Sequence, residues 1–431
     1  MPYIMGKPER IKISDGIDLC FIKADRFKTG KISVVIALPL DGDIAAQAVL
    51  PFILRRSCRK YPDFTALSRR LDYLYGAVTE TSVEKLGEAH IIRMAIVSID
   101  DRFSLDGESV SKDAAELLFD MIFDPKLENG MFCKEDVEIE KRLLLERKIT
   151  ENDDKRAYAL KRCCEIMCEN ESFGKSRFGA DDEIKSLTPE RVYAAWQRVL
   201  KSSIIRVTAV GSGNKDDICS VLNERFDGIK RCPEKPVTAF LPSAGDLKYM
   251  TETQEVKQGK LVLGFRAGMT DRDDYYPGMT VMADIFGGGT YSKLFSVVRE
   301  KMSLCYYCSA RLDRYKGLMF VQSGIETANE EKAKAAILDQ LEEMKKGNFS
   351  DDDFRSSILA ANESLRSFND SPDVLCSWYS NQLLLDTFET PEERMAKTAT
   401  ITRDDVVRAA NNITLDTIFM LAGTGDETDD D

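Results

Sequence analysis

The sequence predicts an α+β protein of two homologous halves, each an α/β sandwich with a mostly antiparallel sheet and helices packed on one side. Three observations support this prediction. The chain has 431 residues, more than one ordinary domain holds. Apolar residues make up 43% and charged residues 31% of it, the balance of a soluble globular protein. Four stretches of the first part of the chain also recur, in the same order, in the second part.

The first two paired stretches predict a strand, a helix and a hairpin in each half. Residues 29–42 (TGKISVVIALPLDG) match residues 258–271 (QGKLVLGFRAGMTD), because a turn glycine and a lysine precede a β-branched apolar run in both. Residues 64–99 match residues 291–325. In each of these, leucine or valine recurs at helical spacing, the helix ends, and two alternating strands follow.

The other two paired stretches predict the remaining helices and one more strand. Residues 112–154 match residues 331–371, and both contain two amphipathic helices joined by a short glycine-containing loop. Residues 187–214 match residues 401–426. Each begins with a threonine N-cap and continues as a helix and an apolar strand that ends in glycine.

A proline-containing segment at residues 231–245 separates the two sets of paired stretches. It has no sustained hydrophobic period, so it is typical of a linker. We therefore predict a first half at residues 1–230 and a second half at residues 246–431.

Composition restricts the compartment and the partners. The N-terminal residues contain no apolar stretch of signal-peptide length, and no apolar run approaches a membrane span. Eleven cysteines are scattered without a disulfide pattern. We therefore expect a cytoplasmic protein with reduced thiols and no membrane partner. Because the net charge of −13 repels polyanions, we expect no nucleic-acid partner.

The chain contains a single histidine, His90, so a zinc site that needs two histidines from one chain is excluded. His90 lies in an alternating apolar strand. At such a position a structural role is favoured over pairing with a cysteine nucleophile.

Two groups of cysteines offer sulfur ligands. Cys305 and Cys308 form a C-x-x-C motif, but no second pair stands at zinc spacing. Both fall in a predicted strand, whose alternation sends the two side chains to opposite faces. A second group, Cys163, Cys164 and Cys168, lies in a predicted helix with Cys164 and Cys168 on one face. We interpret this group as small buried hydrophobic side chains.

Three consecutive glycines, Gly287, Gly288 and Gly289, precede a basic amphipathic segment. A phosphate-binding loop follows a strand and carries a lysine at fixed spacing, whereas these glycines follow a predicted helix and Lys293 stands four residues beyond the last one. Two interpretations remain: close packing of two helices, or contact with a peptide.

The two halves, and above all residues 286–307 (FGGGTYSKLFSVVREKMSLCYY), resemble the insulinase (pitrilysin) family of zinc metallopeptidases. That family also contains the mitochondrial processing peptidase subunits and the core proteins of the cytochrome bc1 complex. The resemblance covers essentially the whole chain. It implies the insulinase-type duplication of a LuxS/metallohydrolase-like fold.

Active members of that family hold zinc through H-x-x-E-H in the first half and a distant glutamate. By the resemblance, the five motif positions fall on Ala48, Val49, Leu50, Pro51 and Phe52. None of these side chains ligates a metal or activates water. Glu140 matches the distant glutamate, and we favour a solvated helix residue there. The resemblance thus implies a vestigial site, with no metal or cofactor in this chain.

Several bacterial members of the family work as pairs of subunits, and this chain resembles the non-catalytic, YfmF-like branch. The arginine and tyrosine of the second half fall on Arg299 and Tyr306. Both side chains can donate hydrogen bonds to a peptide carbonyl or an oxyanion. We expect a peptide-binding subunit that supplies these two residues and Gly287–Gly289 to the zinc site of an H-x-x-E-H partner, and that forms a homodimer when alone.

Three alternatives stay open. Arg299 can instead form a salt bridge within or between helices. The protein can be a scaffold of the same fold without peptide chemistry. An autonomous cysteine enzyme would need His90 beside a thiol of low pKa.

Overall fold

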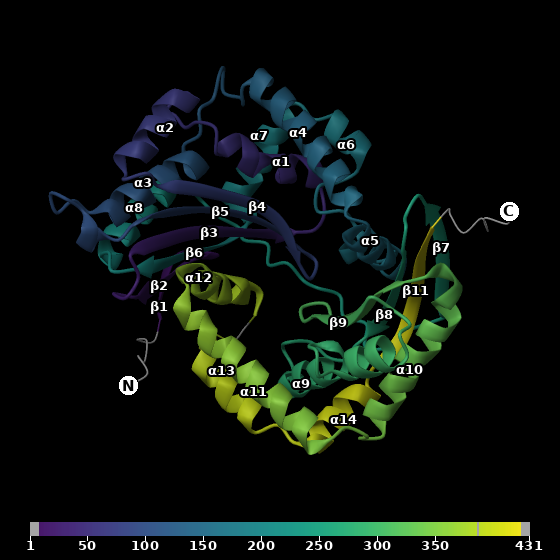
Figure 1. The fold of residues 1–431 in the computed structure, drawn as a ribbon. Helices are drawn as coiled ribbons and strands as arrows, with labels where there is room; N and C mark the ends of the chain where they lie inside the picture. The colour runs from purple at the N-terminus through teal and green to yellow at the C-terminus, as the bar shows by residue number, and fades with distance from the viewer. Residues whose placement is uncertain (1–7, 386–387, 424–431) are drawn as a thin grey trace. The chain divides into compact units, whose positions relative to one another are not determined.

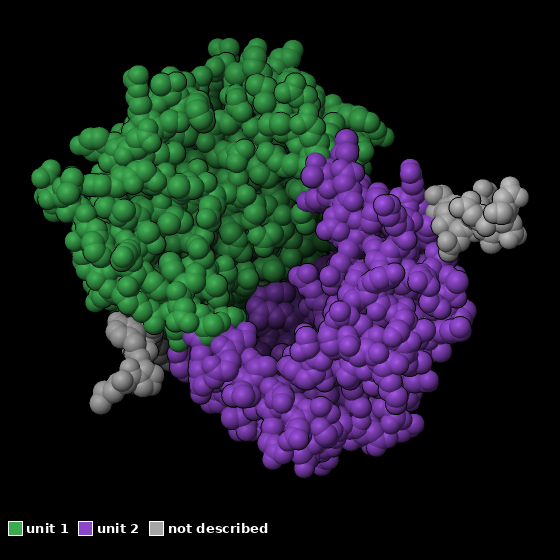
Figure 2. Space-filling view, viewed as in Figure 1, with its two compact units in different colours: residues 1–148, 176–237, 367–390 green, residues 149–175, 238–366, 391–431 purple. Residues whose placement is uncertain are grey.

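The computed structural model describes residues 8–385 and 388–423 (Figure 1). The chain divides into two compact units, which Figure 2 colours separately. Unit 1 consists of Met1–Lys148, Ser176–Val237 and Ser367–Thr390, and unit 2 of Ile149–Lys175, Thr238–Arg366 and Pro391–Asp431. The predicted halves also include residues 1–7, 386–387 and 424–431, which lie outside the described residues.

Unit 1 is built on a sheet whose described strands follow the order β1-β2-β6-β3-β5-β4. β2 and β6 are parallel, and the other neighbours are antiparallel. The strands are β1 (Glu9–Ser14), β2 (Ile17–Lys23), β3 (Thr29–Pro39), β4 (Val78–Leu86), β5 (Ala89–Ile99) and β6 (Ile204–Gly211).

Helices cover both faces of this sheet. They are α1 (Ile44–Leu54), α2 (Phe64–Tyr73), η1 (Asp101–Phe103), α3 (Val110–Phe123), α4 (Lys134–Asp153), α6 (Asp181–Lys185), α7 (Pro189–Ser202), α8 (Lys215–Phe226), η5 (Phe368–Asp370), α12 (Pro372–Asn381) and η6 (Gln382–Leu384). On one face, Val34 and Ile36 of β3 pack in a large core with α1, α3 and α7. On the other face, Val35 and Ala37 meet Leu383 beside α12. Burial on both faces explains the continuous apolar run of β3.

Unit 2 is built on a sheet whose described strands follow the order β7-β11-β8-β10-β9. β7 and β11 are parallel, and the other neighbours are antiparallel. The strands are β7 (Lys248–Gln254), β8 (Gly259–Arg266), β9 (Tyr307–Asp313), β10 (Leu318–Ile325) and β11 (Thr414–Gly423). This order matches β2-β6-β3-β5-β4 of unit 1, strand for strand and direction for direction.

The helices of unit 2 also lie on both faces of their sheet. They are α5 (Lys155–Met167), η2 (Ser172–Gly174), α9 (Tyr276–Gly287), η3 (Leu294–Lys301), η4 (Thr327–Asn329), α10 (Glu330–Lys345), α11 (Asp351–Ser367), α13 (Pro391–Ala399) and α14 (Arg403–Asn411). The main core joins β8 and β10 to α9, α10 and α14. Across the described residues, no helix combines the length and the apolar character needed to cross a membrane.

The two units differ from the predicted halves in where α5 and α12 belong. Helix α5 precedes the predicted linker but belongs to unit 2, and α12 follows it but belongs to unit 1. Each packs on the sheet face opposite to the main core, whereas the sequence predicted helices on one side only. Gly264 of β8 is needed for this contact, because a Cβ there would lie 2.9 Å from Met167 Sδ.

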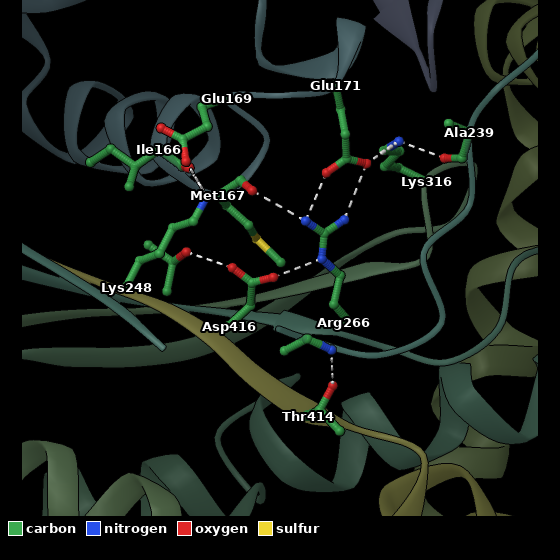
Figure 3. Close-up of polar contacts among 12 residues, drawn as sticks. Ile166, Met167, Glu169, Glu171, Ala239, Lys248, Arg266, Lys316, Thr414 and Asp416 are labelled. Atoms are coloured by element: carbon green, nitrogen blue, oxygen red, sulfur yellow. Dashed lines mark hydrogen bonds and ion pairs between the residues drawn. The ribbon is translucent and has the colours of Figure 1, made fainter. Parts of the chain in front are cut away.

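A buried ionic network holds the end of α5 on the sheet of unit 2 (Figure 3). Arg266 of β8 donates from Nη2 to Glu171 Oε1 (2.7 Å) and from Nε to Asp416 Oδ2 (2.9 Å). Lys316 Nζ lies 2.5 Å from Glu171 Oε2. In unit 1 a buried arginine also contacts the added helix, because Arg206 Nη1 donates to the Tyr379 carbonyl oxygen of α12 (3.1 Å).

Candidate functional site

The five positions of the zinc motif lie on α1, in unit 1. Asp43 caps this helix by accepting a hydrogen bond from the Ala46 amide (3.0 Å). Every residue of α1 is buried, and Ala48 and Phe52 pack in the main core. Pro51 is the residue that the sequence resemblance assigns to the motif's glutamate. The helix therefore places apolar side chains at all five positions and offers no metal donor there.

Glu140 of α4 lies close to these positions. Its side chain is 1% exposed, so the favoured interpretation as a solvated helix residue was wrong. Oε1 accepts a hydrogen bond from Arg56 Nη1 (3.0 Å), and Oε2 lies 3.7 Å from Arg147 Nη1. A buried carboxylate needs such partners, since the loss of hydration would otherwise cost several kcal/mol.

The guanidinium of Arg147 lies over the ring of Phe52, with Cζ 3.9 Å from the ring centroid. Burial, together with the nearby positive charge of Arg55, lowers the pKa of Arg147. Zinc sites use thiolate, imidazole and carboxylate ligands, and among the five motif positions and Glu140 only Glu140 offers one. The residues present therefore do not fit zinc. Two guanidinium groups supply the positive charge beside Glu140.

A cleft of ≈ 570 Å³ borders Glu140. Phe64, Leu67 and Leu71 give it an apolar wall, and Arg55 and Arg56 give it a basic one. Thr79 of β4, the edge strand of the sheet, also lines it. An edge strand has unpaired backbone groups that can pair with an extended peptide.

The three glycines lie at the end of α9, in unit 2. Gly287 is the last helical residue, and the Gly288 amide donates to the Asp284 carbonyl oxygen (2.8 Å). A Cβ on Gly287 would lie 2.6 Å from the Ala310 amide nitrogen of β9. Gly287 therefore allows close packing of a helix on a strand. Gly288 is exposed, so its contact with a peptide stays a prediction.

Arg299 lies on η3, which is a π-helix: the Met302 amide donates to the Val297 carbonyl oxygen (2.9 Å), five residues back. Its side chain is 39% exposed and lies 3.6 Å from Glu300 Oε1. The guanidinium also lies 4.5 Å from the centroid of the Phe295 ring. These contacts orient the guanidinium and still leave it open to solvent.

Tyr306 comes immediately before β9, the edge strand of the second sheet. Its amide donates to the Gly324 carbonyl oxygen (2.9 Å), and the residue is 63% exposed. Tyr307 is half-buried instead, with the Arg156 guanidinium 4.3 Å from its ring centroid. Within the described part of the chain, no hydrogen bond joins Arg299 to Tyr306.

Comparison with known proteins identifies the family. A family model described as the peptidase M16 inactive domain matches residues 186–360. The chain is 30% identical to the "Probable inactive metalloprotease YmfF" of Bacillus subtilis over 410 residues, which cover 95% of this chain and 96% of that protein. The chain belongs to the peptidase M16 family. This confirms the resemblance found in the sequence.

Solved structures agree with this membership. A conserved protein from Enterococcus faecalis V583 has a TM-score of 0.87 and 26% identity, covering 99% of this chain and 100% of that one. A peptidase M16 inactive domain from Pseudomonas fluorescens has a TM-score of 0.79 and 14% identity, covering 97% and 98% of the two chains. The likeness to the Pseudomonas fluorescens domain, at 14% identity, shows a shared fold and nothing more.

Two cysteines near Arg299 and Tyr306 lie in the same core, contrary to the expectation from strand alternation. Cys305 and Cys308 are both buried in the main core of unit 2. Strand β9 begins only at Tyr307, and Ser303 has a φ of 51°. Strict alternation therefore does not apply to Cys305, and the prediction of opposite faces was wrong. The C-x-x-C spacing was the available signal.

The remaining sequence-predicted candidates are structural in this M16 chain. His90 is fully buried, with Nε2 2.8 Å from the Arg177 carbonyl oxygen and Nδ1 2.9 Å from the Gln47 side chain. Burial lowers the pKa of His90 to about 4. Cys163 and Cys168 pack in the core between α5 and the sheet. All eleven cysteines are free thiols.

Proposed function

We propose that this chain is the non-catalytic, peptide-binding subunit of a two-chain M16 peptidase. In this proposal a partner chain supplies H-x-x-E-H, the zinc ion and the activated water. This chain supplies Arg299, Tyr306, the glycine segment Gly287–Gly289 and the unpaired edge of β9. The guanidinium and the phenol would donate hydrogen bonds to a peptide carbonyl as negative charge develops on its oxygen.

One contrast carries the proposal. At the position that the resemblance assigns to zinc, apolar side chains and an arginine–glutamate cluster stand in place of ligands, and the apolar side chains and Glu140 are buried. In the segment with Arg299 and Tyr306, both functional groups stay exposed beside a free sheet edge. We place the pair in the cytoplasm, and we expect the isolated chain to form a homodimer, which light scattering would detect.

The test is reconstitution with an H-x-x-E-H subunit from the same organism. Arg299→Ala and Tyr306→Phe should each lower kcat/KM for peptide cleavage by about 10²-fold to 10³-fold, the usual cost of removing one oxyanion donor. Arg355→Ala and Tyr275→Phe serve as matched controls, since both residues are exposed on unit 2 and lie outside residues 287–306. One tightly bound zinc ion and peptidase activity in the isolated chain would overturn the proposal.

A scaffold role is the second candidate. The contacts of Arg299 with Phe295 and Glu300 favour it, because they give the guanidinium a structural role within its own helix. A scaffold would retain full function of the pair in the Tyr306→Phe variant, because Tyr306 is 63% exposed and its hydroxyl forms no hydrogen bond with the residues that the structure describes. Activity equal to that of the wild-type pair in this variant would therefore favour the scaffold.

A further inference from the structure

One face of the second sheet is polar at its β9 edge. The side chains of β9 alternate between the two faces, and those that pack in the main core are Cys308, Ala310 and Leu312. The opposite face therefore presents Tyr307, Ser309 and Arg311. Helix α5 packs on this same face through β8 and β11. The polar side chains of β9 thus share one sheet face with α5.

A glycine lets the ring of Tyr307 lie across this face. Gly324 of β10 stands between Tyr307 and Lys260 of β8 in the register of the three strands. A Cβ at Gly324 would clash with Tyr307 Cε1, so the ring occupies the space that a side chain would need. Lys260 Nζ lies 5.9 Å from the ring centroid, and the Arg156 guanidinium of α5 lies 4.3 Å from it. Two cations therefore share one aromatic ring.

These two cations have neutral hydrogen-bond partners. Arg156 donates from Nη2 to Ser309 Oγ (3.1 Å) and from Nε to Gln322 Oε1 (3.4 Å). Lys260 Nζ donates to Gln258 Oε1 (2.7 Å). Within the described part of the chain, neither cation forms an ion pair with a carboxylate. Their positive charges are thus fixed in place but not compensated.

The surroundings do not supply the missing negative charge. Burial and the positive charge of Arg156 lower the pKa of Lys260, and Asp154 opposes this effect. Asp154 already caps α5, because it accepts hydrogen bonds from the amides of Arg156 (3.0 Å) and Ala157 (3.1 Å). Arg311 is exposed on the same face of β9 and, among the described residues, has no ion pair either. Three such cations stand together in a chain whose net charge is −13.

We propose that Arg156, Lys260 and Arg311 form a binding site for a carboxylate of a peptide that lies along β9. The inference rests on the proposed function for the placement of the peptide, and it adds a substrate class: peptides with an acidic side chain or a free C-terminal carboxylate. A carboxylate would accept hydrogen bonds from these groups and reduce the repulsion between them.

The geometry of strand addition supports this site. A peptide that pairs with the free edge of β9 directs every second side chain toward the α5 face of the sheet. Ser309 and Arg311 succeed Tyr307 on that face at the same spacing of two residues. A single acidic side chain in the peptide can therefore reach the cations while the peptide backbone stays paired with the strand.

The test measures binding of three peptides to the isolated chain by isothermal titration calorimetry at low ionic strength. All are N-acetylated decapeptides of serine, threonine and alanine. The reference has a central glutamine and an amidated C-terminus, the second has glutamate in place of the glutamine, and the third keeps the glutamine but has a free C-terminal carboxylate. At least one carboxylate should lower Kd by about 5-fold relative to the reference, and high salt should reduce this gain.

The comparison of the second and third peptides shows whether a side chain or the C-terminus supplies the carboxylate. Equal Kd values for all three peptides would overturn the proposal, as would the absence of binding by every one of them.

Three variants locate the site. Arg156→Gln and Lys260→Gln should each remove most of the gain. Lys332→Gln should retain it, because Lys332 is an exposed lysine of α10, which packs on the other face of the sheet. This control removes the same charge from unit 2. Circular dichroism shows whether each variant is folded. A gain that persists in both folded patch variants would mean that the carboxylate binds elsewhere.

These outcomes are distinct from the failure of the proposed function. Carboxylate binding at this site, together with wild-type activity of the Tyr306→Phe pair, would overturn the peptidase role and leave the site standing. Loss of activity in the Tyr306→Phe pair, together with equal Kd values for the three peptides, would overturn the site alone.

Discussion

The guanidinium of Arg147 lies 3.9 Å from the ring centroid of Phe52, one of the two positions that the sequence resemblance assigns to the histidines of H-x-x-E-H. The same group lies 3.7 Å from Glu140 Oε2. An aromatic face and a carboxylate both attract a cation, so one arginine replaces part of what the metal would contribute. The former zinc position is thus a packed structural cluster, and its loss should appear as lower stability.

Arg147→Met should lower the free energy of unfolding of unit 1 by about 1–3 kcal/mol. The variant keeps an apolar stem but leaves Glu140 Oε2 buried without a cation. Both tryptophans, Trp196 and Trp378, lie in unit 1, so their fluorescence in urea reports its unfolding. Arg142→Met on the same helix is the matched control, because Arg142 is exposed and lies 3.7 Å from Glu146. Its effect should stay within about 0.5 kcal/mol.

Glu171→Ala should destabilise unit 2 by about 3–5 kcal/mol. The change leaves Arg266 and Lys316 buried with one negative partner fewer, which is costly because neither cation can recover its hydration. Hydrogen exchange followed by mass spectrometry should show faster exchange in α5, which the network holds on the sheet. Glu169→Ala is the control, since Glu169 is exposed and pairs with Lys248 at the surface. Equal exchange in the two variants would contradict this account.

The sequence predicted the individual helices and strands better than it predicted which sheet each helix packs on. The apolar runs of β3 and β8, the hairpins and the threonine caps follow from short-range patterns, and the structure contains each of them. The placement of α5 and α12 depends on contacts such as that of Arg266 with Glu171, 95 residues apart in sequence. An amphipathic stripe shows that one helix face is buried, but it does not show which sheet covers it.

The same limit applies to the candidate site. Glu140 lies on a charged helix whose sequence is typical of a solvated element, and its buried carboxylate is paired with Arg147 of the same helix and with Arg56 of the turn after α1. The burial of Cys305 and Cys308 in the same core depends on the irregular backbone before β9, which period-two reasoning cannot anticipate. By contrast, the apolar character of Ala48, Pro51 and Phe52 was readable from the sequence alone.

His90 should make the stability of unit 1 depend on pH. Burial lowers the pKa of His90 to about 4 from an ordinary value of 6.5. Between these two values the unfolded chain binds a proton that the folded chain does not. Stability therefore falls as the pH drops from about 6.5 to about 4, by on the order of 3 kcal/mol for this group, and it does not change further below that range.

The measurement is the free energy of unfolding from urea curves at pH 7.5 and pH 5, in the wild type and in His90→Gln. The glutamine amide can still donate a hydrogen bond toward the Arg177 carbonyl oxygen, but it cannot titrate. The variant should therefore lose less stability than the wild type between the two pH values, by on the order of 2 kcal/mol. Carboxylates contribute equally to both proteins and cancel in this difference. Equal losses would mean that His90 is protonated at the same pH in the folded and unfolded chains.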